Sequence, residues 1–260
     1  MQYSITDCHP LHLYDGVEQG TQEWLELREG KITCSNAKDL LLHGPIYCLK
    51  RNQQAARRLT PNGNSYADRG HVIEADTKNM FNQAMSGVGY EIADYTFLTN
   101  DFFPDAGYSP DGLVIDDSKG VCQFIPVEVK AYNDTTRNEY TGEVRTPNKH
   151  IKAVDSFDNV PLAAKCQMQM EMLLTGADRM FLLLANPDCV DASKRFKVWT
   201  VNFDPMMGME ISKKLLGESG IFEVWRHWQR SFEQFTENAD QNFLDKYSDN
   251  IGDIATKNFW

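Results

Sequence analysis

The stretch Ser109-Pro110-Asp111-Gly112-Leu113, with Val127-Glu128-Val129-Lys130 a little later, decides the fold that the sequence predicts. The Ser-Pro-Asp-Gly part favours a turn, because proline fixes φ, aspartate can bond its own backbone and glycine accepts a positive φ. The branched residues 113–115 then predict a strand, and a second polar turn leads into a returning strand over 121–131. The two strands are expected to form a β-hairpin.

Three charged residues of this hairpin are candidates for chemistry. Glu128 and Lys130 are two residues apart on the returning strand, so their side chains point to the same face. Asp111, at the start of the neighbouring strand, can converge with them. Two carboxylates can hold Mg²⁺, and a lysine beside them could orient or help activate a water molecule. The alternative is that the Glu-x-Lys pair lies on a solvated face and that the aspartate serves only the turn.

Composition limits the class of protein. A chain of 260 residues with 42% hydrophobic residues can bury a sizeable core as one elaborated domain. It has no apolar run of 18 residues, and its first ten residues lack a basic segment followed by an apolar one, so neither a membrane span nor a secretory signal is expected. Six cysteines without a Cys-x-x-Cys pair favour free thiols in a reducing cytosol. The net charge of −11 predicts that any DNA contact is confined to a locally basic channel.

The segment before the hairpin contains a possible phosphate site. Residues 1–20 are expected to be irregular. Thr21 is a predicted N-cap of a short helix, and Ser35 a predicted N-cap of a second helix that continues to Leu42. Arg28 and a helix N-terminus therefore lie close in sequence, and both bind phosphate well. The alternative is a capped helix with a surface arginine.

Two further features precede the hairpin. The densest basic cluster, over 50–58, is either a contact for a DNA backbone or a solvated helix face. A helix is predicted from Tyr66 to Met85, and Glu74 lies beside its apolar stripe, although a lone helical glutamate is most often solvated. The residues of that stripe are Val72, Ile73, Met80, Phe81 and Met85.

The order of the remaining elements predicts the fold class. The polar segment 132–150 is a candidate for a mobile or DNA-facing part. Further expected elements are a strand over 90–99, a helix over 160–175 with Gly176 as its stop, a buried strand over 181–185, an alternating strand over 196–203 and helices from 205 onward. This order predicts an α/β (α+β) fold, with a central mixed sheet and helices on both faces.

Five motifs, in order along residues 21 to about 187, give the chain a family resemblance. They are Glu23-Trp24-Leu25-x-Leu27-Arg28-x-Gly30-x-Ile32-Thr33-x-Ser35, Arg69-Gly70 with Glu74, Ser109-Pro110-Asp111-Gly112-Leu113, Glu128-Val129-Lys130, and Gln167-Met168-Gln169 with Met172 and Thr175. In this order they resemble the phage lambda-type alkaline exonucleases. That family is the viral recombinase branch of the restriction-endonuclease-like, or PD-(D/E)XK, nucleases. Two departures are Ala131, where the family often has cysteine, and a long hairpin.

The resemblance implies one nuclease domain over 1–260 and a set of site residues. The domain would comprise an N-terminal helical part (about 21–85), a catalytic core (about 90–203) and a C-terminal helical extension (about 205–260). The implied catalytic residues are Glu74, Asp111, Glu128, Lys130 and Gln167. Asp111 and Glu128 would bind metal together with the Val129 carbonyl, and Glu74 would support a second ion. Lys130 would position the attacking water, with Gln167 bracing the lysine or the water.

A second site and an activity follow from the same resemblance. Arg28, Ser35 and Ser109 match the family's pocket for a 5′-terminal phosphate. The implied enzyme is a deoxyribonuclease that digests double-stranded DNA from 5′ to 3′ with two Mg²⁺ ions, for which Mn²⁺ can substitute. It would leave 3′ overhangs for a single-strand annealing protein in phage-type recombination, in the cytoplasm of a bacterial host. Many members form a trimeric ring, so a homotrimer is implied.

Two other readings are left open at this stage. One is an endonuclease or a single-strand nuclease on the same core. The other is a catalytically inactive protein that binds DNA ends.

Overall fold

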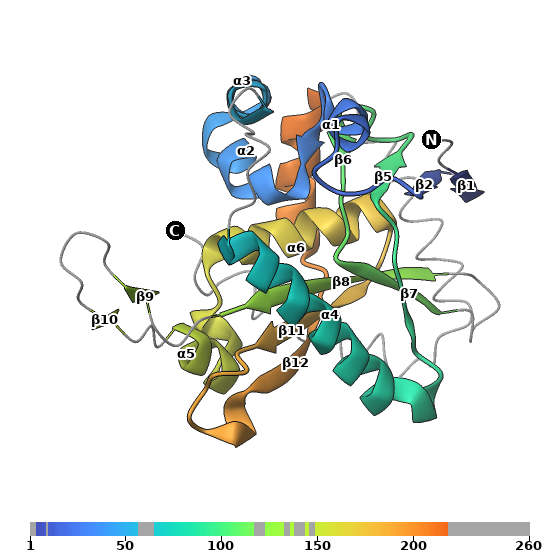
Figure 1. Cartoon of the computed structure of the whole chain (residues 1–260). Helices are drawn as coiled ribbons and strands as arrows, with labels where there is room; N and C mark the ends of the chain where they lie inside the picture. Colours follow the sequence, from blue (N-terminus) through green and yellow to red (C-terminus); the bar gives the residue numbers. More distant parts are fainter. Residues whose placement is uncertain are drawn as a thin grey trace.

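The computed structural model describes residues 4–8, 10–56, 65–116, 123–132, 136–137, 144–145 and 149–217, and Figure 1 shows the arrangement of their elements. A mixed five-stranded sheet, in the order β12-β11-β8-β7-β4, lies at the centre. β8 and β11 run parallel, and the other neighbouring strands run antiparallel. The strands are β4 (Ile92–Ala93), β7 (Gly112–Asp116), β8 (Gln123–Ala131), β11 (Arg179–Ala185) and β12 (Phe196–Asn202).

Helices cover both faces of this sheet, as the sequence predicts (Figure 1). α4 (Ser65–Met85) packs on one face, where the Phe81 and Phe181 ring centroids are 5.2 Å apart. α6 (Leu162–Thr175) packs on the other, where Met168 and Met172 share a buried cluster with Leu182. Because side chains alternate along β11, neighbouring residues point to opposite helices. Both faces are covered, which explains the nearly continuous burial along β8 and β11.

β7 and β8 form the predicted hairpin, with Gly112 opposite Val127 and Asp116 opposite Gln123. The turn between them, 117–122, lies outside the described residues. Gly112 does not adopt the positive φ that the turn motif suggested. Its glycine is required by a close approach instead, because a Cβ there would lie 2.3 Å from Ile92 Cγ2 of β4.

Gly112→Ala is therefore expected to destabilise the protein by about 1–3 kcal/mol, the usual cost of overpacking a well-packed core. Urea unfolding monitored by circular dichroism measures this free energy. Gly87→Ala is the matched control, because a Cβ at Gly87 would have no heavy atom within 4 Å. Equal stability of the two variants would contradict the packing argument.

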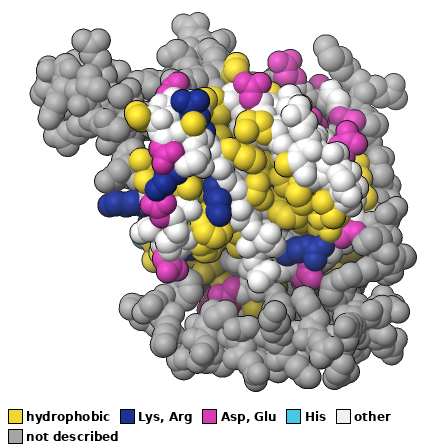
Figure 2. Space-filling view, turned by 90° about the horizontal axis from the view of Figure 1, so that it is seen from below, with side chains coloured by type: hydrophobic (Ala, Val, Ile, Leu, Met, Phe, Trp, Pro, Cys, Tyr) yellow, Lys and Arg dark blue, Asp and Glu magenta, His cyan; other side chains and the backbone are white. Residues whose placement is uncertain are grey.

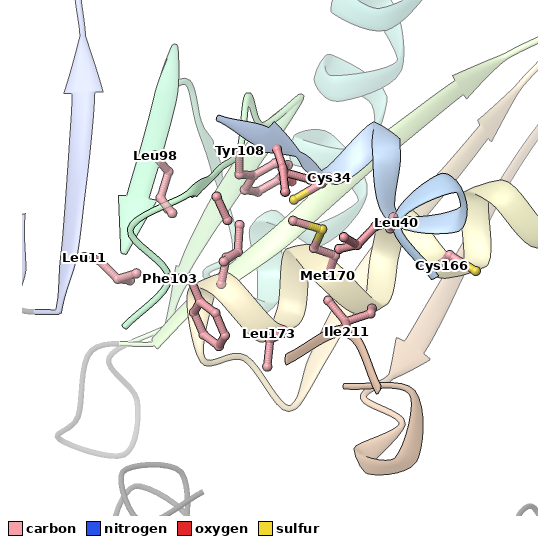
Figure 3. Close-up of a cluster of buried hydrophobic side chains, with 14 of the residues drawn as sticks. Leu11, Cys34, Leu40, Leu98, Phe103, Tyr108, Cys166, Met170, Leu173 and Ile211 are labelled. Carbon is pink, nitrogen blue, oxygen red and sulfur yellow. The ribbon is translucent and has the colours of Figure 1, made fainter. Parts of the chain in front are cut away.

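The segment of residues 22–56 packs against α6 through a buried cluster. Its elements are α1 (Gln22–Arg28), β3 (Ile32–Thr33), η1 (Cys34–Asn36), α2 (Ala37–His43) and α3 (Pro45–Ala56). β3 pairs in parallel with β6 (Ala106–Gly107) just before the hairpin. In Figure 3, Cys34, Leu40 and Tyr108 approach Met170 of α6. This cluster therefore holds the segment carrying Arg28 and Ser35 near the start of the hairpin.

The prediction for residues 1–20 is wrong, and the one for 90–99 is only partly right. β1 (Ser4–Cys8) and β2 (Leu11–Asp15) form an antiparallel sheet with β5 (Phe97–Asn100). Leu11 and Leu13 share one face of β2, which is buried, and they alternate with less buried side chains on the other face. The expected single strand over 90–99 is divided between two sheets, since β4 joins the central sheet and β5 joins this smaller one.

Two local predictions about helices also need correction. Ser35 does not cap α2: it lies inside η1, and a capping box formed by Thr33 and Asn36 precedes the helix. In α4 the expected apolar stripe is narrower, because Ile73 and Phe81 are buried whereas Val72 and Met80 are exposed. Residues four apart share a helix face and adjacent residues do not, so only every fourth position faces the sheet.

The later elements agree with the predictions where the structure describes them. α6 ends at a left-handed Gly176, β11 and β12 occupy the predicted strand positions, and residues 205–217 are helical. The rest of the expected C-terminal extension, 218–260, lies outside the described residues, as do 57–58 of the basic cluster. The other short elements are η2 (Ser86–Val88), β9 (Thr136–Arg137), β10 (Val144–Arg145), α5 (Lys149–Asp155), η3 (Phe157–Asn159) and η4 (Ala192–Lys194).

The face of the described residues in Figure 2 carries charges of both signs. In Figure 2 the Lys and Arg side chains on one face are separate groups between hydrophobic, acidic and neutral ones. No helix in the part of the chain described by the structure is long and apolar enough to cross a lipid bilayer. Four cysteines, Cys34, Cys48, Cys166 and Cys189, are buried free thiols, as expected.

Candidate active site

Asp111 and the β8 residues meet at one end of the central sheet. Asp111 immediately precedes β7, and its Oδ2 accepts a hydrogen bond of 2.7 Å from the backbone N–H of Val129. Glu128 and Lys130 flank Val129 on β8, and therefore share the opposite side of the strand. The hydrogen bond thus fixes the Asp111 carboxylate beside the strand segment that carries the other two candidate residues.

Glu128 is almost fully buried, and Lys130 forms an ion pair with it. Burial acts to lower the pKa of the Lys130 ammonium, but the charge and the hydrogen bond of Glu128 outweigh burial and raise this pKa above its ordinary value. Lys130 therefore carries its proton at neutral pH and can donate hydrogen bonds.

Gln167 and Glu171 approach the site from α6. They are four residues apart, so they lie on one helix face, and Gln167 Nε2 donates a hydrogen bond of 2.8 Å to Glu171 Oε1. Glu171 is fully buried, and its Oε2 has no hydrogen-bond partner among the described residues. The resemblance places Gln167 against the lysine or the water, whereas its hydrogen bond in the structure goes to Glu171.

Glu74 reaches the site from α4, together with a lysine that the sequence analysis did not select. Lys78 Nζ lies 2.9 Å from Glu74 Oε1 and 3.0 Å from Asp94 Oδ1. It also donates a hydrogen bond of 2.6 Å to the backbone carbonyl of Asp111. Burial acts to lower the pKa of Lys78, but its hydrogen bonds to Glu74 and Asp94 raise it overall. Lys78 thus links α4 directly to the residue that precedes β7.

Two of the acidic side chains at the site, Asp111 and Glu171, have raised pKa values. Burial raises the pKa of Asp111 well above its usual range, and the charges of Glu128 and Glu74 raise it further, although the Val129 N–H acts in the opposite direction. Burial likewise raises the pKa of Glu171 well above its usual range, and the Glu128 charge adds to this effect. The four carboxyl groups therefore share one electrostatic environment, which favours an added positive charge.

The donor set suits a hard divalent cation. Within the described ranges, no three His, Cys, Asp or Glu side chains are grouped closely enough to hold an ion by themselves. Glu74 and Glu128 are paired with Lys78 and Lys130. A cation would relieve the repulsion between the buried carboxylates, and carboxylate oxygens are the ligands that Mg²⁺ prefers. Asp111 and Glu128 are the side chains that would hold it; their ligand roles, like that of the Val129 carbonyl, stay predictions.

Arg28 lies beside the start of the hairpin. Its Nη1 donates a hydrogen bond of 3.1 Å to Ser109 Oγ, and its guanidinium carbon lies 4.0 Å from the centroid of the Trp24 ring. Burial lowers the pKa of Arg28 below its ordinary value, but an arginine side chain still remains charged at neutral pH. Ser109 is two residues before Asp111 in the chain. The Arg28–Ser109 hydrogen bond therefore holds this guanidinium close to the acidic site.

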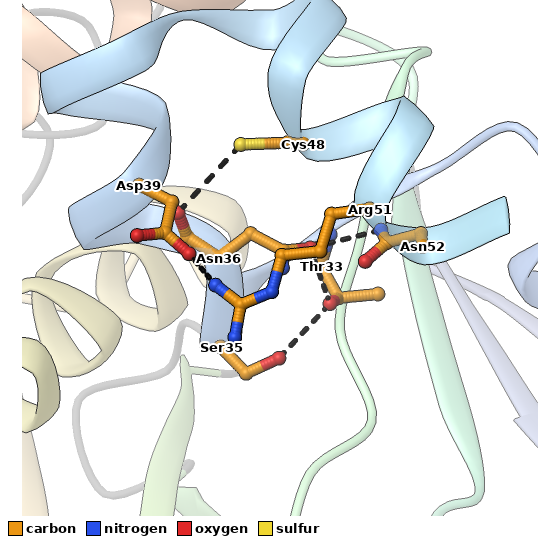
Figure 4. Close-up of polar contacts among 7 residues, drawn as sticks. All are labelled: Thr33, Ser35, Asn36, Asp39, Cys48, Arg51 and Asn52. Atoms are coloured by element: carbon orange, nitrogen blue, oxygen red, sulfur yellow. Dashed lines mark hydrogen bonds and ion pairs between the residues drawn. The ribbon is translucent and has the colours of Figure 1, made fainter. Parts of the chain in front are cut away.

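Ser35 belongs to a polar network at the start of α2, which Figure 4 shows. Its Oγ lies 3.1 Å from Thr33 Oγ1, and Asn36 Oδ1 accepts hydrogen bonds from Thr33 and from Asn52 of α3. Among the described residues, no hydrogen bond joins Ser35 to Arg28. The structure therefore pairs Arg28 with Ser109, and holds Ser35 through Thr33.

Comparison with known protein families identifies the chain. The profile of the YqaJ-like viral recombinase domain matches residues 23–178, which include every predicted site residue. The chain belongs to this viral recombinase family. The resemblance found in the sequence is thereby confirmed. No curated protein sequence matches significantly.

Solved structures show the same fold as this viral recombinase-family protein. The alkaline exonuclease LHK-Exo from Laribacter hongkongensis is similar with a TM-score of 0.52 and 18% identity, over 84% of this chain and 100% of that chain. The structure of LHK-Exo in complex with dAMP gives a TM-score of 0.54 with the same identity and coverage. The expected fold, a central mixed sheet flanked by helices, is confirmed.

The sequence analysis did not select two charged residues of this viral recombinase-family protein that lie beside the site, Lys78 and Glu171. Lys78 follows Glu74 by four residues, and Glu171 follows Gln167 by four, so each shares a helix face with a residue that the sequence had already indicated. That spacing was the available signal. A glutamate within the apolar run of α6 was a second signal, because a buried carboxyl group requires partners.

Proposed function

We propose that this protein is a metal-dependent DNA exonuclease that hydrolyses double-stranded DNA from its 5′ end. The observation that supports this most strongly is the meeting of Asp111, Glu128 and Lys130 at one end of the sheet, with Glu74 acting on Asp111 electrostatically. Membership in the viral recombinase family supports the same chemistry. These residues also favour a hydrolase over the reading of a catalytically inactive protein that binds DNA ends.

Each residue of the site has a role in this proposal. Asp111 and Glu128 would hold Mg²⁺, or Mn²⁺ as a substitute, and Glu74 would support a second ion. When bound, the metal lowers the pKa of water and stabilises the charge that develops on the phosphate. Lys130 is protonated, so it orients the attacking water as a hydrogen-bond donor rather than accepting a proton. Gln167 acts through Glu171, which it contacts.

Arg28 and Ser109 supply the proposed polarity. A guanidinium binds a terminal phosphate well, and a hydroxyl can add a further hydrogen bond. Because Ser109 lies two residues before Asp111, a phosphate held here would place a nearby phosphodiester at the carboxylates. Ser35 completes the proposed pocket.

Digestion from 5′ to 3′ would leave a 3′ overhang for a single-strand annealing protein in recombination within a bacterial host. A homotrimeric ring is part of the same proposal.

The experiment compares duplexes that carry either a 5′-phosphate or a 5′-hydroxyl at one end, with Mg²⁺ present. We expect faster release of mononucleotides from the phosphorylated strand, and Arg28→Ala should remove most of this preference, about 10-fold or more, because charged hydrogen bonds contribute about 1.5–3 kcal/mol. Lys213→Ala is the control, since Lys213 is an exposed cation outside the basic cluster and pairs with Glu210.

Three outcomes would contradict the proposal. Equal digestion rates from the 5′-phosphate and the 5′-hydroxyl end would contradict the proposed phosphate pocket. Digestion from the 3′ end would reverse the polarity. Cleavage of closed circular DNA would favour an endonuclease, because an exonuclease requires an end.

A further inference from the structure

Lys78 makes three polar contacts that bring together separate parts of the acidic site. Its ammonium contacts a carboxylate of its own helix, Glu74, and the carboxylate of Asp94, which follows β4. The third contact is the backbone carbonyl of Asp111. An ammonium group has three N–H donors, so these three acceptors use all of them.

Asp111 is thereby held at two points. Lys78 of α4 holds its carbonyl, and the N–H of Val129 in β8 holds its carboxylate. The residue lies just before β7, at the end of the turn that opens the hairpin, where only neighbouring elements fix its orientation. Loss of the Lys78 contact would leave the carboxylate bonded but its backbone free to shift.

The Lys78 contacts differ from an ordinary surface ion pair. The Lys78 side chain is 17% exposed, whereas its partner Asp94 is 78% exposed. Exposed helical pairs four residues apart contribute only about 0.3–0.5 kcal/mol, so an arrangement of that kind would have little effect on the site. The contact with a backbone carbonyl beside a buried carboxylate is what gives Lys78 its influence.

We propose that Lys78 is a positioning residue, which sets the Glu74 carboxylate and the Asp111 backbone in the arrangement that hydrolysis requires. This inference rests on the proposed nuclease function. Lys78 contacts neither DNA nor water in the reaction; it acts through Glu74 and Asp111. Groups that orient metal-binding carboxylates typically change affinity or activity 10–100-fold when they are removed.

The test uses Lys78→Met, which keeps a long unbranched side chain without the charge, and Lys78→Arg, which keeps the charge and the donors. The control is Lys213→Met, because Lys213 is an exposed lysine that pairs with Glu210 three residues before it. The measurements are kcat and KM on a 5′-phosphorylated duplex, Mn²⁺ binding by calorimetry, and the thermal unfolding midpoint.

For Lys78→Met we expect kcat to fall about 10–100-fold with KM for the duplex unchanged, because the Arg28 pocket is intact. Mn²⁺ binding is retained, since the substitution removes a positive charge and frees the Glu74 carboxylate. Lys78→Arg restores part of kcat. This combination separates positioning from a purely structural role, in which unfolding would remove binding and turnover together.

Unchanged kcat in Lys78→Met would overturn the inference, as would loss of Mn²⁺ binding in both Lys78 variants. If Lys78→Met does not fold, Lys78→Arg decides: a folded arginine variant with full loss of turnover also overturns it. A wild-type protein that neither binds Mn²⁺ nor digests DNA would instead refute the proposed function, and this inference with it.

Discussion

Asp111→Asn is expected to reduce the rate of DNA hydrolysis about 10³-fold, similar to the loss of one strong electrostatic group at a transition state. Asparagine can still accept the hydrogen bond from Val129, so the turn before β7 is kept while the negative charge is removed. Lys130→Met should have a comparable effect, because it removes the ammonium beside Glu128. The initial rate of nucleotide release from a 5′-phosphorylated duplex at saturating Mg²⁺ measures both.

The matched control is Asp158→Asn, an exposed aspartate in η3 whose backbone carbonyl, not its carboxylate, accepts a hydrogen bond from Lys165. It should digest DNA at the wild-type rate. Unchanged digestion by Asp111→Asn and Lys130→Met would remove the proposed active site. A fall in rate that is matched by a fall in the thermal midpoint would show loss of folding instead, so both quantities are measured on the same samples.

Glu171→Gln is expected to stabilise the metal-free protein at pH 8 and to make its stability less dependent on pH. Burial raises the pKa of Glu171 in the folded protein well above the ordinary value of 4.5. The folded state therefore binds a proton that the unfolded state releases. For such a group the stability is fully present below about pH 4.5 and is lost as pH rises through the folded-state pKa. Glutamine stays neutral, and its carbonyl can still accept from Gln167.

The measurement is urea unfolding in EDTA between pH 5 and 8. A pKa difference of one unit corresponds to about 1.4 kcal/mol. The stability of Glu171→Gln relative to wild type should therefore rise as the pH is raised across this range. Glu210→Gln, at an exposed position, is the control and should show no such change. If the difference in unfolding free energy between Glu171→Gln and wild type stays constant across pH, burial does not raise the pKa of Glu171 and the prediction is wrong.

The sequence predicted the parts of the site that depend on local geometry. Glu128 and Lys130 share a strand face because side chains alternate with a period of two, and this holds in any sheet that includes the segment. Thr21 caps α1 because its side chain reaches the N–H of Trp24 within one turn. The helix–hairpin–helix order was also visible, because each element has its own periodicity and turn residues.

Local pattern failed where one short segment depends on another. Residues 90–99 look like one strand, yet they divide between two sheets because β2 provides a partner for β5. Serine is a residue type that often caps helices, but at Ser35 it does not, and Thr33 and Asn36 form the capping box instead. Such choices depend on which partner offers hydrogen bonds and burial in the folded chain, and neighbouring residues do not contain that information.

By itself the sequence determined the hairpin and the mixed α/β class, and it predicted the residues that would hold a cation or a phosphate. Only the tertiary structure decided how they are combined. Lys78 and Asp111 are 33 residues apart, and Arg28 and Ser109 are 81 apart, yet each pair is joined by a hydrogen bond. The physical reason is burial. Packing of the helices around one sheet brings these groups together and partly removes them from water, and their partners and pKa values are set only then.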